Sequence, residues 1–393
     1  MSPELRERLR ELEPPEAGAA ERRAWELVAA AHAERAPRRA RRRGRWLAAA
    51  AAVLGVTAVT AFTPAGAAVG DWMSDVVNPG RKDARPALGP LPAEGRLLVS
   101  SPAGAWVVQP GGGARRLGDY GEASWSPHGL FVVATRGRQL VALEPGGAPR
   151  WTLSLDAPAT RPAWSPGDGY RIAYLSGGAL RVVAGDGTGD RLLDGAAADV
   201  SPAWRPRGPH HVVAYARSGG RVALADADDG RRLGRSIPGI RPTALAWTPK
   251  GRRLVAMAPG WVWVLDAALR NRGRTAMPTG TVAQAMAVHP GGRSVAVIRR
   301  VPGGRSEVVS IPLRGPGGQR TLFAGQGSFS DLAWSPDGRW LLVAWPEADQ
   351  WLFIRSNRVR RIDAVRDIRR QFDPGGTGAG AFPRLGGWCC AGG

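Results

Sequence analysis

The residues of this chain best suited to metal or acid–base chemistry are its five histidines. His128 and His289 each stand beside a proline in turn-like sequence, and His210 and His211 stand together at the start of a strand-like run. Because a β-strand points successive side chains to opposite faces, the two adjacent rings are not expected to share one ion. The histidines therefore indicate turn or surface positions, and no metal site is predicted from them.

Two short acidic or glycine-rich segments resemble ligand-binding loops but lack essential parts of them. Asp226, Asp228 and Asp229 resemble a calcium loop, yet the following Gly230 does not fit its spacing and no glutamate closes the site. The Gly-Asp-Gly-Thr-Gly run at 185–189 resembles a phosphate loop, but no helical pattern follows it. Both segments are typical of hairpin turns, so no cofactor is predicted at either.

No catalytic signature occurs in the sequence. It contains no Gly-x-Ser-x-Gly elbow, no His-Glu-x-x-His pair and no nucleotide-binding Walker loop. The two cysteines, Cys389 and Cys390, are too few for a disulfide framework or a four-ligand zinc site. We therefore expect a protein that is not an enzyme.

The composition indicates a folded, strongly basic protein with many turns. The net charge is +21, and 44% of the residues are hydrophobic, which is sufficient for a core. The 54 glycines and 33 prolines exceed a fifth of the 393 residues, against about 12% in ordinary proteins. A basic surface attracts nucleic acid or an anionic envelope polymer, but the simpler interpretation is a solvated arginine-rich surface, and nucleic acid is not an expected partner.

The first 45 residues predict a cytoplasmic segment of short helices that ends in a basic cluster. Leu5, Leu9 and Leu12 fall on one helical face, and residues 17–35 show a second helical pattern. Neither helix buries much apolar surface alone, so both need each other or a partner. The basic cluster consists of six arginines: Arg38, Arg39, Arg41, Arg42, Arg43 and Arg45.

An uncharged stretch directly follows these arginines. Residues 46–68 are long enough for a transmembrane helix, which needs about 20 residues. The arginine cluster places the N-terminus in the cytoplasm, so the rest of the chain is expected outside the cell membrane. Two alternatives stay open: cleavage at the small residues Ala65–Ala67, and a buried helix of a soluble protein. Residues 69–94 are predicted to be a linker.

One short pattern recurs from residue 95 onward: a small residue, an aromatic one, Ser or a substitute, Pro and then Gly. Strand-like runs such as 211–216 and 221–225 follow each copy. Successive key positions are 39, 40, 43, 41 and 46 residues apart, and about four strands per 42 residues is the repeat of a β-propeller blade. These key positions are Trp125, Trp164, Trp204, Trp247, Val288 and Trp334.

The two ends of the repeat region predict a seventh blade. Residues 96–117 hold three strand-like runs without a first strand, and Gln371–Gly376 looks like a first strand without its blade. Phe372 would take the aromatic position of that strand. The predicted fold is therefore an all-β, seven-bladed propeller over residues 95–376, closed by both chain ends and preceded by the helices described above.

The Trp-Ser-Pro-Asp-Gly-Arg motif at 334–339, with its weaker copies, resembles the TolB-like, or WD-repeat-like, bacterial propellers. The resemblance covers about residues 95–376. It implies that the tryptophans pack between blades and that Pro-Asp-Gly makes a hairpin. Val288 and Phe372 depart from tryptophan, a change that a packing role tolerates.

The tail, residues 377–393, is glycine-rich, then aromatic, and ends near Cys389 and Cys390. We interpret it as a plug of the propeller base or its central channel, with a redox or docking role as the alternative. Adjacent cysteines outside the membrane would form a vicinal disulfide or bridge to another chain.

Together these features predict a membrane-anchored extracytoplasmic propeller that acts as a non-catalytic binding scaffold. An unknown protein or envelope partner would bind its loops. The alternative is a transmembrane sensor whose residues 1–36 bind a cytoplasmic factor, because the layout resembles that of membrane-bound anti-sigma factors. The zinc-type His-x-x-x-Cys-x-x-Cys signature is missing, however, and the N-terminal segment is small.

Overall fold

The computed structural model describes residues 88–390, except 168–169, 209, 315–317, 357–360, 374, 376–377 and 379. The predicted cytoplasmic segment 1–45 with its arginine cluster, the predicted transmembrane helix 46–68 and most of the predicted linker 69–94 lie outside these residues. Within the described part of the chain, no helix is both long and apolar enough to cross a membrane.

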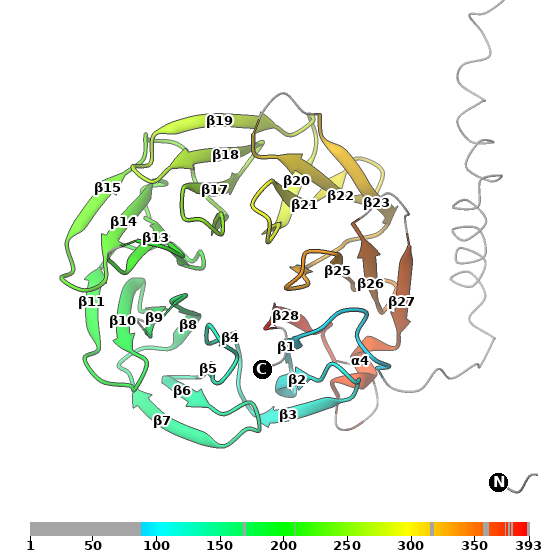
Figure 1. The fold of residues 1–393 in the computed structure, drawn as a ribbon, viewed down its shortest axis with the longest axis horizontal. Helices are drawn as coiled ribbons and strands as arrows, with labels where there is room; N and C mark the ends of the chain where they lie inside the picture. The colour runs from blue at the N-terminus through cyan, green and yellow to red at the C-terminus, as the bar shows by residue number, and fades with distance from the viewer. Residues whose placement is uncertain are drawn as a thin grey trace, which may run out of the picture. The chain divides into compact units, whose positions relative to one another are not determined.

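Seven four-stranded antiparallel sheets are arranged in a ring around a central axis (Figure 1). The predicted all-β, seven-bladed propeller is thus confirmed. Each blade starts with its innermost strand and ends with its outermost one. The strands of blades 1 to 4 are, in chain order, β4 (Ala123–Trp125), β5 (Val132–Arg136), β6 (Gln139–Leu143) and β7 (Pro149–Ser154); β8 (Ala159–Trp164), β9 (Arg171–Ser176), β10 (Ala179–Ala184) and β11 (Arg191–Asp194); β12 (Ala203–Trp204), β13 (Val212–Ala216), β14 (Val222–Asp226) and β15 (Arg232–Arg235); β16 (Ala244–Trp247), β17 (Arg253–Ala258), β18 (Trp261–Asp266) and β19 (Asn271–Ala276).

Blade 7 combines the two ends of the described chain. Its order is β28-β1-β2-β3, so the last strand of the chain pairs with the first. This pairing closes the ring and leaves no open blade edge between the ends. The strands of blades 5 to 7 are β20 (Val282–Val288), β21 (Ser294–Val301), β22 (Arg305–Pro312) and β23 (Arg320–Gln326); β24 (Leu332–Trp334), β25 (Trp340–Trp345), β26 (Gln350–Arg355) and β27 (Ile362–Arg366); and β28 (Arg384–Cys389), β1 (Arg96–Ser101), β2 (Gly104–Val108) and β3 (Ala114–Gly118).

The closing strand lies further along the chain than the sequence predicted. Phe372 is not in a strand: it follows the short helix α4 (Ile368–Gln371) and is buried between Trp106 and Trp351, with ring centroids 5.8 and 5.2 Å away. β28 supplies the first strand instead, and Trp388 takes the aromatic position. The propeller boundary at 376 was therefore wrong. Residues 384–389 of the tail do not act as the predicted plug, because backbone pairing with β1 incorporates them into the sheet.

The recurring Trp-Ser-Pro-x-Gly segment makes the turn between the first and second strands of a blade. In blade 6 the Ser335 hydroxyl accepts a hydrogen bond from the Trp340 backbone N–H (3.0 Å) and donates one to Asp337 (2.6 Å). Gly338 has a φ of +69°, a conformation that favours glycine. The motif recurs because its hydroxyl and its glycine each stabilise the conformation of this turn.

Indole side chains join neighbouring blades. The Nε1–H groups of Trp204, Trp247 and Trp334 donate to backbone carbonyls of the preceding blade at 2.8 to 3.1 Å. Trp125 and Trp164 end the first strands of blades 1 and 2 and are each 8% exposed. Apolar side chains fill the space between sheets, as Leu224 of blade 3 and Leu254 of blade 4 do in one buried cluster.

In blades 3 and 5 a longer side chain stands in place of the turn hydroxyl. Arg205 donates to the Gly251 carbonyl of the next blade (2.9 Å), and His289 bonds the Gly338 carbonyl in the same way (3.1 Å). His289 also lies against Trp334, with ring centroids 4.7 Å apart. These departures from the motif therefore add contacts between blades, and Val288 keeps its place at the end of β20.

Candidate functional site

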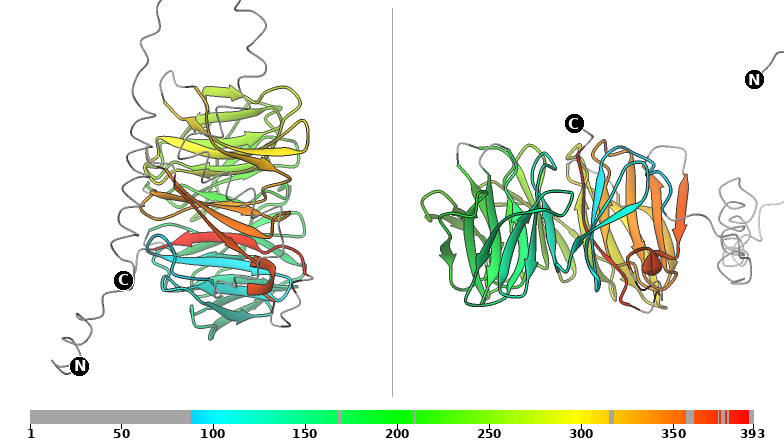
Figure 2. Two further views of the ribbon diagram at one scale, coloured as in Figure 1. Left: turned by 90° about the vertical axis from the view of Figure 1, so that its right-hand side faces the viewer. Right: turned by 90° about the horizontal axis from the view of Figure 1, so that it is seen from below.

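The ring has two faces, and one of them carries the turns that follow the innermost strands. We call this the turn face; it also carries the turns between the third and fourth strands of each blade. Figure 2 (right) shows the ring from the side, with turns gathered at both faces. Two neighbouring pockets open on the turn face over blades 1 to 3.

The larger pocket lies between blades 1 and 2 and has a volume of about 710 Å³. Aromatic and basic side chains line most of it, including Phe131, Trp151, Tyr170, Arg150 and Arg171, together with the acidic Asp186. Tyr170 is 37% exposed, and the Arg150 guanidinium lies over the Phe131 ring at 5.9 Å. Such a lining suits a ligand that has a flat or apolar part and an acidic group.

Trp151 forms part of the wall of this pocket, and contacts with blade 2 hold its indole in place. The Nε1–H donates to the Gly185 carbonyl at 2.8 Å. Gly187, which has a φ of +86°, packs so closely on the ring that a Cβ there would lie 2.8 Å from Cδ2. The glycine-rich turn 185–189, predicted as a hairpin, lies between β10 and β11 and holds this indole in place.

We predict that Gly187→Ala destabilises the protein and alters the wall of the larger pocket. The methyl group would push on the Trp151 ring, and an overpacked contact of this kind costs about 1–3 kcal/mol. Gly189→Ala is the matched control: its φ is +65°, but nothing lies within 4 Å of the added Cβ. Urea denaturation of both variants measures the difference, and equal midpoints would show that the Trp151 contact is unimportant.

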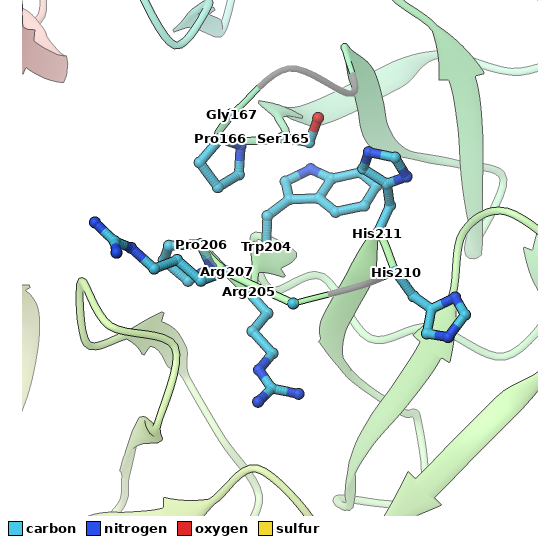
Figure 3. Close-up of a pocket in the computed structure, with 10 residues that line it drawn as sticks. Ser165, Pro166, Gly167, Trp204, Arg205, Pro206, Arg207, His210 and His211 are labelled. Atoms are coloured by element: carbon cyan, nitrogen blue, oxygen red, sulfur yellow. The ribbon is translucent and has the colours of Figure 1, made fainter.

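The smaller pocket, about 370 Å³, lies between blades 2 and 3 (Figure 3). Ser165 and Pro166 line one side, and Trp204, Arg207 and His211 line the other. Arg207 is exposed. Figure 3 shows the rings of His210 and His211 pointing in different directions, so the two imidazoles do not face the same ligand.

His211 is held by an acidic partner from the turn between β14 and β15. Its Nδ1 lies 2.8 Å from Asp228 Oδ1, and its backbone N–H donates to Oδ2 at 3.2 Å. Arg171 approaches the same carboxylate at 3.6 Å. Burial alone would raise the pKa of Asp228, but the His211 hydrogen bonds and the charges of His211 and Arg171 together lower it.

The second histidine meets a different aspartate. His210 Nδ1 lies 3.3 Å from Asp226 Oδ2, and the Asp226 side chain is 1% exposed. The ligand atoms of His210, Asp226 and Asp228 all lie within 4.8 Å of one another. Sequence reasoning treated the histidines and aspartates separately, because they belong to two turns 15 or more residues apart. Antiparallel pairing of β13 with β14 brings those turns together.

Charged residues lie in or just before the innermost strands, toward the face of the ring opposite the turn face. Arg161 pairs with Glu122 (3.2 Å) and Asp199 (3.0 Å), and Arg384 pairs with Asp331 (2.7 Å). The hydrogen bond from Arg384 to Asp331 is the main cause of the raised pKa of this guanidinium. These charges neutralise one another across blades, which favours a role in joining the ring over ligand binding.

Cys389 and Cys390 are joined in a disulfide at the end of β28. Cys390 Sγ lies 3.5 Å from the Pro127 carbonyl oxygen, so the disulfide contacts the first turn of blade 1. Neither cysteine is free. The pair therefore sits where the closing strand meets the next blade.

Comparisons with known proteins identify the fold and not a family. No protein-family model matches the chain, and no match is found among curated proteins. A solved structure of a putative 6-phosphogluconolactonase from Bacteroides uniformis is similar, with 16% identity, a TM-score of 0.52, and coverage of 69% of this chain and 96% of that one.

Two further structures are similar to a comparable degree. Kuenenia stuttgartiensis hydrazine synthase matches at 14% identity and a TM-score of 0.50, over 59% of this chain and 75% of that one. The β-propeller domain of Cps50 (Swd1) from Myceliophteria thermophila matches at 14% identity and a TM-score of 0.49, over 62% and 84%. At such low identity, likeness shows the fold alone.

Proposed function

We propose that this protein is a TolB-like, non-catalytic binding propeller, anchored in the cell membrane by residues 46–68 with the propeller outside. Its partner binds the turn face over blades 1 to 3. The observation that carries this proposal is the pair of adjoining pockets there, of about 710 and 370 Å³. Both volumes fall in the range of known ligand sites.

The chemistry of the pockets favours a partner that presents acidic groups. Arg150 and Arg207 are exposed at their rims, and aromatic side chains line the larger pocket. Arg150 also pairs with Glu144 at 3.2 Å on the surface, where such a pair is weak enough for a partner's acidic group to compete. Most of the net charge of +21 belongs to the residues that follow the membrane span, and it adds a long-range attraction for such a partner. A protein or polymer of the cell envelope that carries carboxylate or phosphate groups fits these features.

We predict that reversing the two rim charges reduces partner binding about tenfold, equivalent to about 1.4 kcal/mol. The test compares the full-length wild type with the Arg150→Glu, Arg207→Glu double variant by in-cell crosslinking and quantitative mass spectrometry. Arg138→Glu is the control, because Arg138 is exposed in the turn between β5 and β6, on the other face. Equal partner yields from the double variant and the wild type would contradict the proposal.

The sensor alternative rests on the N-terminal segment, where Leu5, Leu9 and Leu12 share one predicted helical face. The same crosslinking experiment distinguishes this sensor hypothesis from one in which the N-terminal segment only anchors the chain. Crosslinks between residues 1–45 and a transcription factor would make this protein a signalling receptor. Crosslinks confined to the propeller would leave the N-terminal segment as an anchor only.

A further inference from the structure

Two turns of blade 3 meet on the turn face and bring together one histidine and two aspartates. His210 precedes β13, and Asp226 and Asp228 lie at the end of β14 and in the turn after it. His210 Nδ1 is 3.3 Å from Asp226 Oδ2, and all three ligand atoms lie within 4.8 Å of one another.

These separations are close to those of a bound metal ion. Ligand atoms at about 2.0–2.2 Å from one tetrahedral zinc ion lie about 3.3–3.6 Å apart. The distance of 3.3 Å between His210 Nδ1 and Asp226 Oδ2 falls within this range. The Asp228 side chain is 35% exposed, and a small rotation would bring one of its carboxylate oxygens into range while the other stays bonded to His211.

The donor types select the kind of metal. One imidazole nitrogen with two carboxylate oxygens suits zinc and related transition metals, whereas calcium and magnesium prefer oxygen ligands alone. The His210 side chain is 53% exposed, so water can complete the coordination shell from the solvent side. Three protein ligands with water in the fourth position is a coordination that zinc adopts in proteins.

The burial of Asp226 gives a second, independent reason for a cation here. Its side chain is 1% exposed, and a carboxylate removed from water needs a counter-charge or a metal. The imidazole of His210 supplies a full charge only when protonated. A divalent ion would compensate the carboxylate and take up the imidazole lone pair at the same time.

The surrounding residues would hold the ligands in position. His211 bonds the Asp228 carboxylate through its ring and its backbone N–H, which matches the outer-shell support of metal-binding carboxylates. The Asp228 N–H donates to Asp226 Oδ1 at 2.9 Å, which leaves Oδ2 directed at His210. Arg171, 3.6 Å from Asp228, would weaken the affinity without blocking the site.

We propose that His210, Asp226 and Asp228 bind one divalent transition-metal ion, with zinc the best match, on the turn face of blade 3. The site borders the smaller pocket, which His210 and His211 help to line. The inference does not depend on the proposed partner, because the ion would bind whether or not the pockets are occupied.

The test is metal titration of the purified full-length chain, without a polyhistidine tag and after removal of metals with a chelator. We expect one zinc ion per chain by calorimetry, and a cobalt form with visible d–d absorption. His210→Ala should weaken binding at least a hundredfold and remove the cobalt bands. His211→Ala, which changes only the supporting shell, should weaken binding 10- to 100-fold.

Two controls keep the site assignment specific. Asp229→Asn removes a neighbouring exposed carboxylate that pairs with Arg231, and His128→Ala removes the exposed histidine in the matching turn of blade 1. Both should bind zinc within twofold of the wild type. If the wild type gives neither binding heat nor cobalt bands, or if His210→Ala binds as the wild type does, the proposal is overturned.

Discussion

A chain that ends at residue 381 is expected to lose its cooperative unfolding transition. It lacks β28, so β1 would expose an unpaired edge and blade 7 would keep only three strands. It also loses Trp388, which packs on Phe353 at a centroid distance of 5.7 Å and donates its N–H to the Glu94 carbonyl. Circular dichroism during thermal denaturation measures the transition.

The matched control is a chain that ends at residue 390, which keeps β28 and the disulfide. It should unfold like the full-length chain. The comparison also distinguishes the two closing strands, since the chain ending at 381 still contains Phe372. If that shorter chain unfolded at the same temperature and as sharply, closure by β28 would be wrong. In the full-length chain, Trp388→Ala should cost about 3–5 kcal/mol.

Asp194→Ala is expected to cost about 3 kcal/mol of unfolding free energy, because it breaks a buried polar cluster. The Asp194 residue is 3% exposed. Its Oδ2 accepts the Tyr215 hydroxyl at 2.7 Å, and Arg217 and Arg232 approach at 3.0 and 3.4 Å. Burial and the bond to Asp194 raise the pKa of Tyr215, so the phenol remains a donor. Urea denaturation measures the loss.

The control for this variant is Asp199→Ala, five residues further along. Asp199 is 73% exposed on its side chain and pairs with Arg161 near the surface, so its removal should cost no more than about 1 kcal/mol. Similar losses for the two variants would mean that burial does not set the strength of the Asp194 cluster.

The contribution of Asp194 should also depend on pH. Burial would raise its pKa, but the Tyr215 bond, the Ala196 N–H and the two arginines together lower it. A lowered folded-state pKa adds stability above the unfolded value of about 3.9, and this stability is lost as pH falls through the folded value. The difference between wild type and Asp194→Asn should be constant from about pH 5 to 7 and shrink below about pH 4. A constant difference down to pH 2 would contradict this cause.

The sequence was sufficient to predict the ring because the blade motif acts locally. Ser335, Asp337 and Gly338 each satisfy a bond or a backbone conformation within one turn. In three of the copies the hydroxyl of Ser126, Ser165 or Thr248 accepts a backbone N–H in the same way, so the period survives even where Val288 replaces tryptophan. Because these requirements act within a few residues, they produce a sequence repeat that can be recognised without knowing the tertiary contacts.

The closing strand was missed because it lacks the second half of that motif. Trp388 follows Gly386 and Gly387 as a repeat tryptophan follows small residues, but the chain supplies no Ser-Pro-x-Gly turn after it. Helix α4 and the segment after it also lengthen the spacing from Trp334 to 54 residues. The small-small-Trp pattern was the one available signal.

The candidate site was predicted less well than the fold, because its residues meet only through long-range pairing. Asp226 and Asp228 were assigned to a hairpin, which is their place in the structure, yet their approach to His210 depends on the register of β13 and β14. The pockets likewise combine residues of adjacent blades, such as Trp151 and Tyr170. Contacts of this kind leave no fixed spacing in the sequence.

The most direct test of the binding face is position-specific photo-crosslinking in cells that express the full-length chain. Photoreactive residues would replace Ala148 and Asp229, which are exposed on the turn face of blades 1 and 3, and Arg138 and Ser218 in exposed turns of the opposite face of the same blades. We expect partner adducts from the first pair and none from the second. Adducts from positions 138 and 218, with none from positions 148 and 229, would contradict the assignment of the turn face as the binding surface.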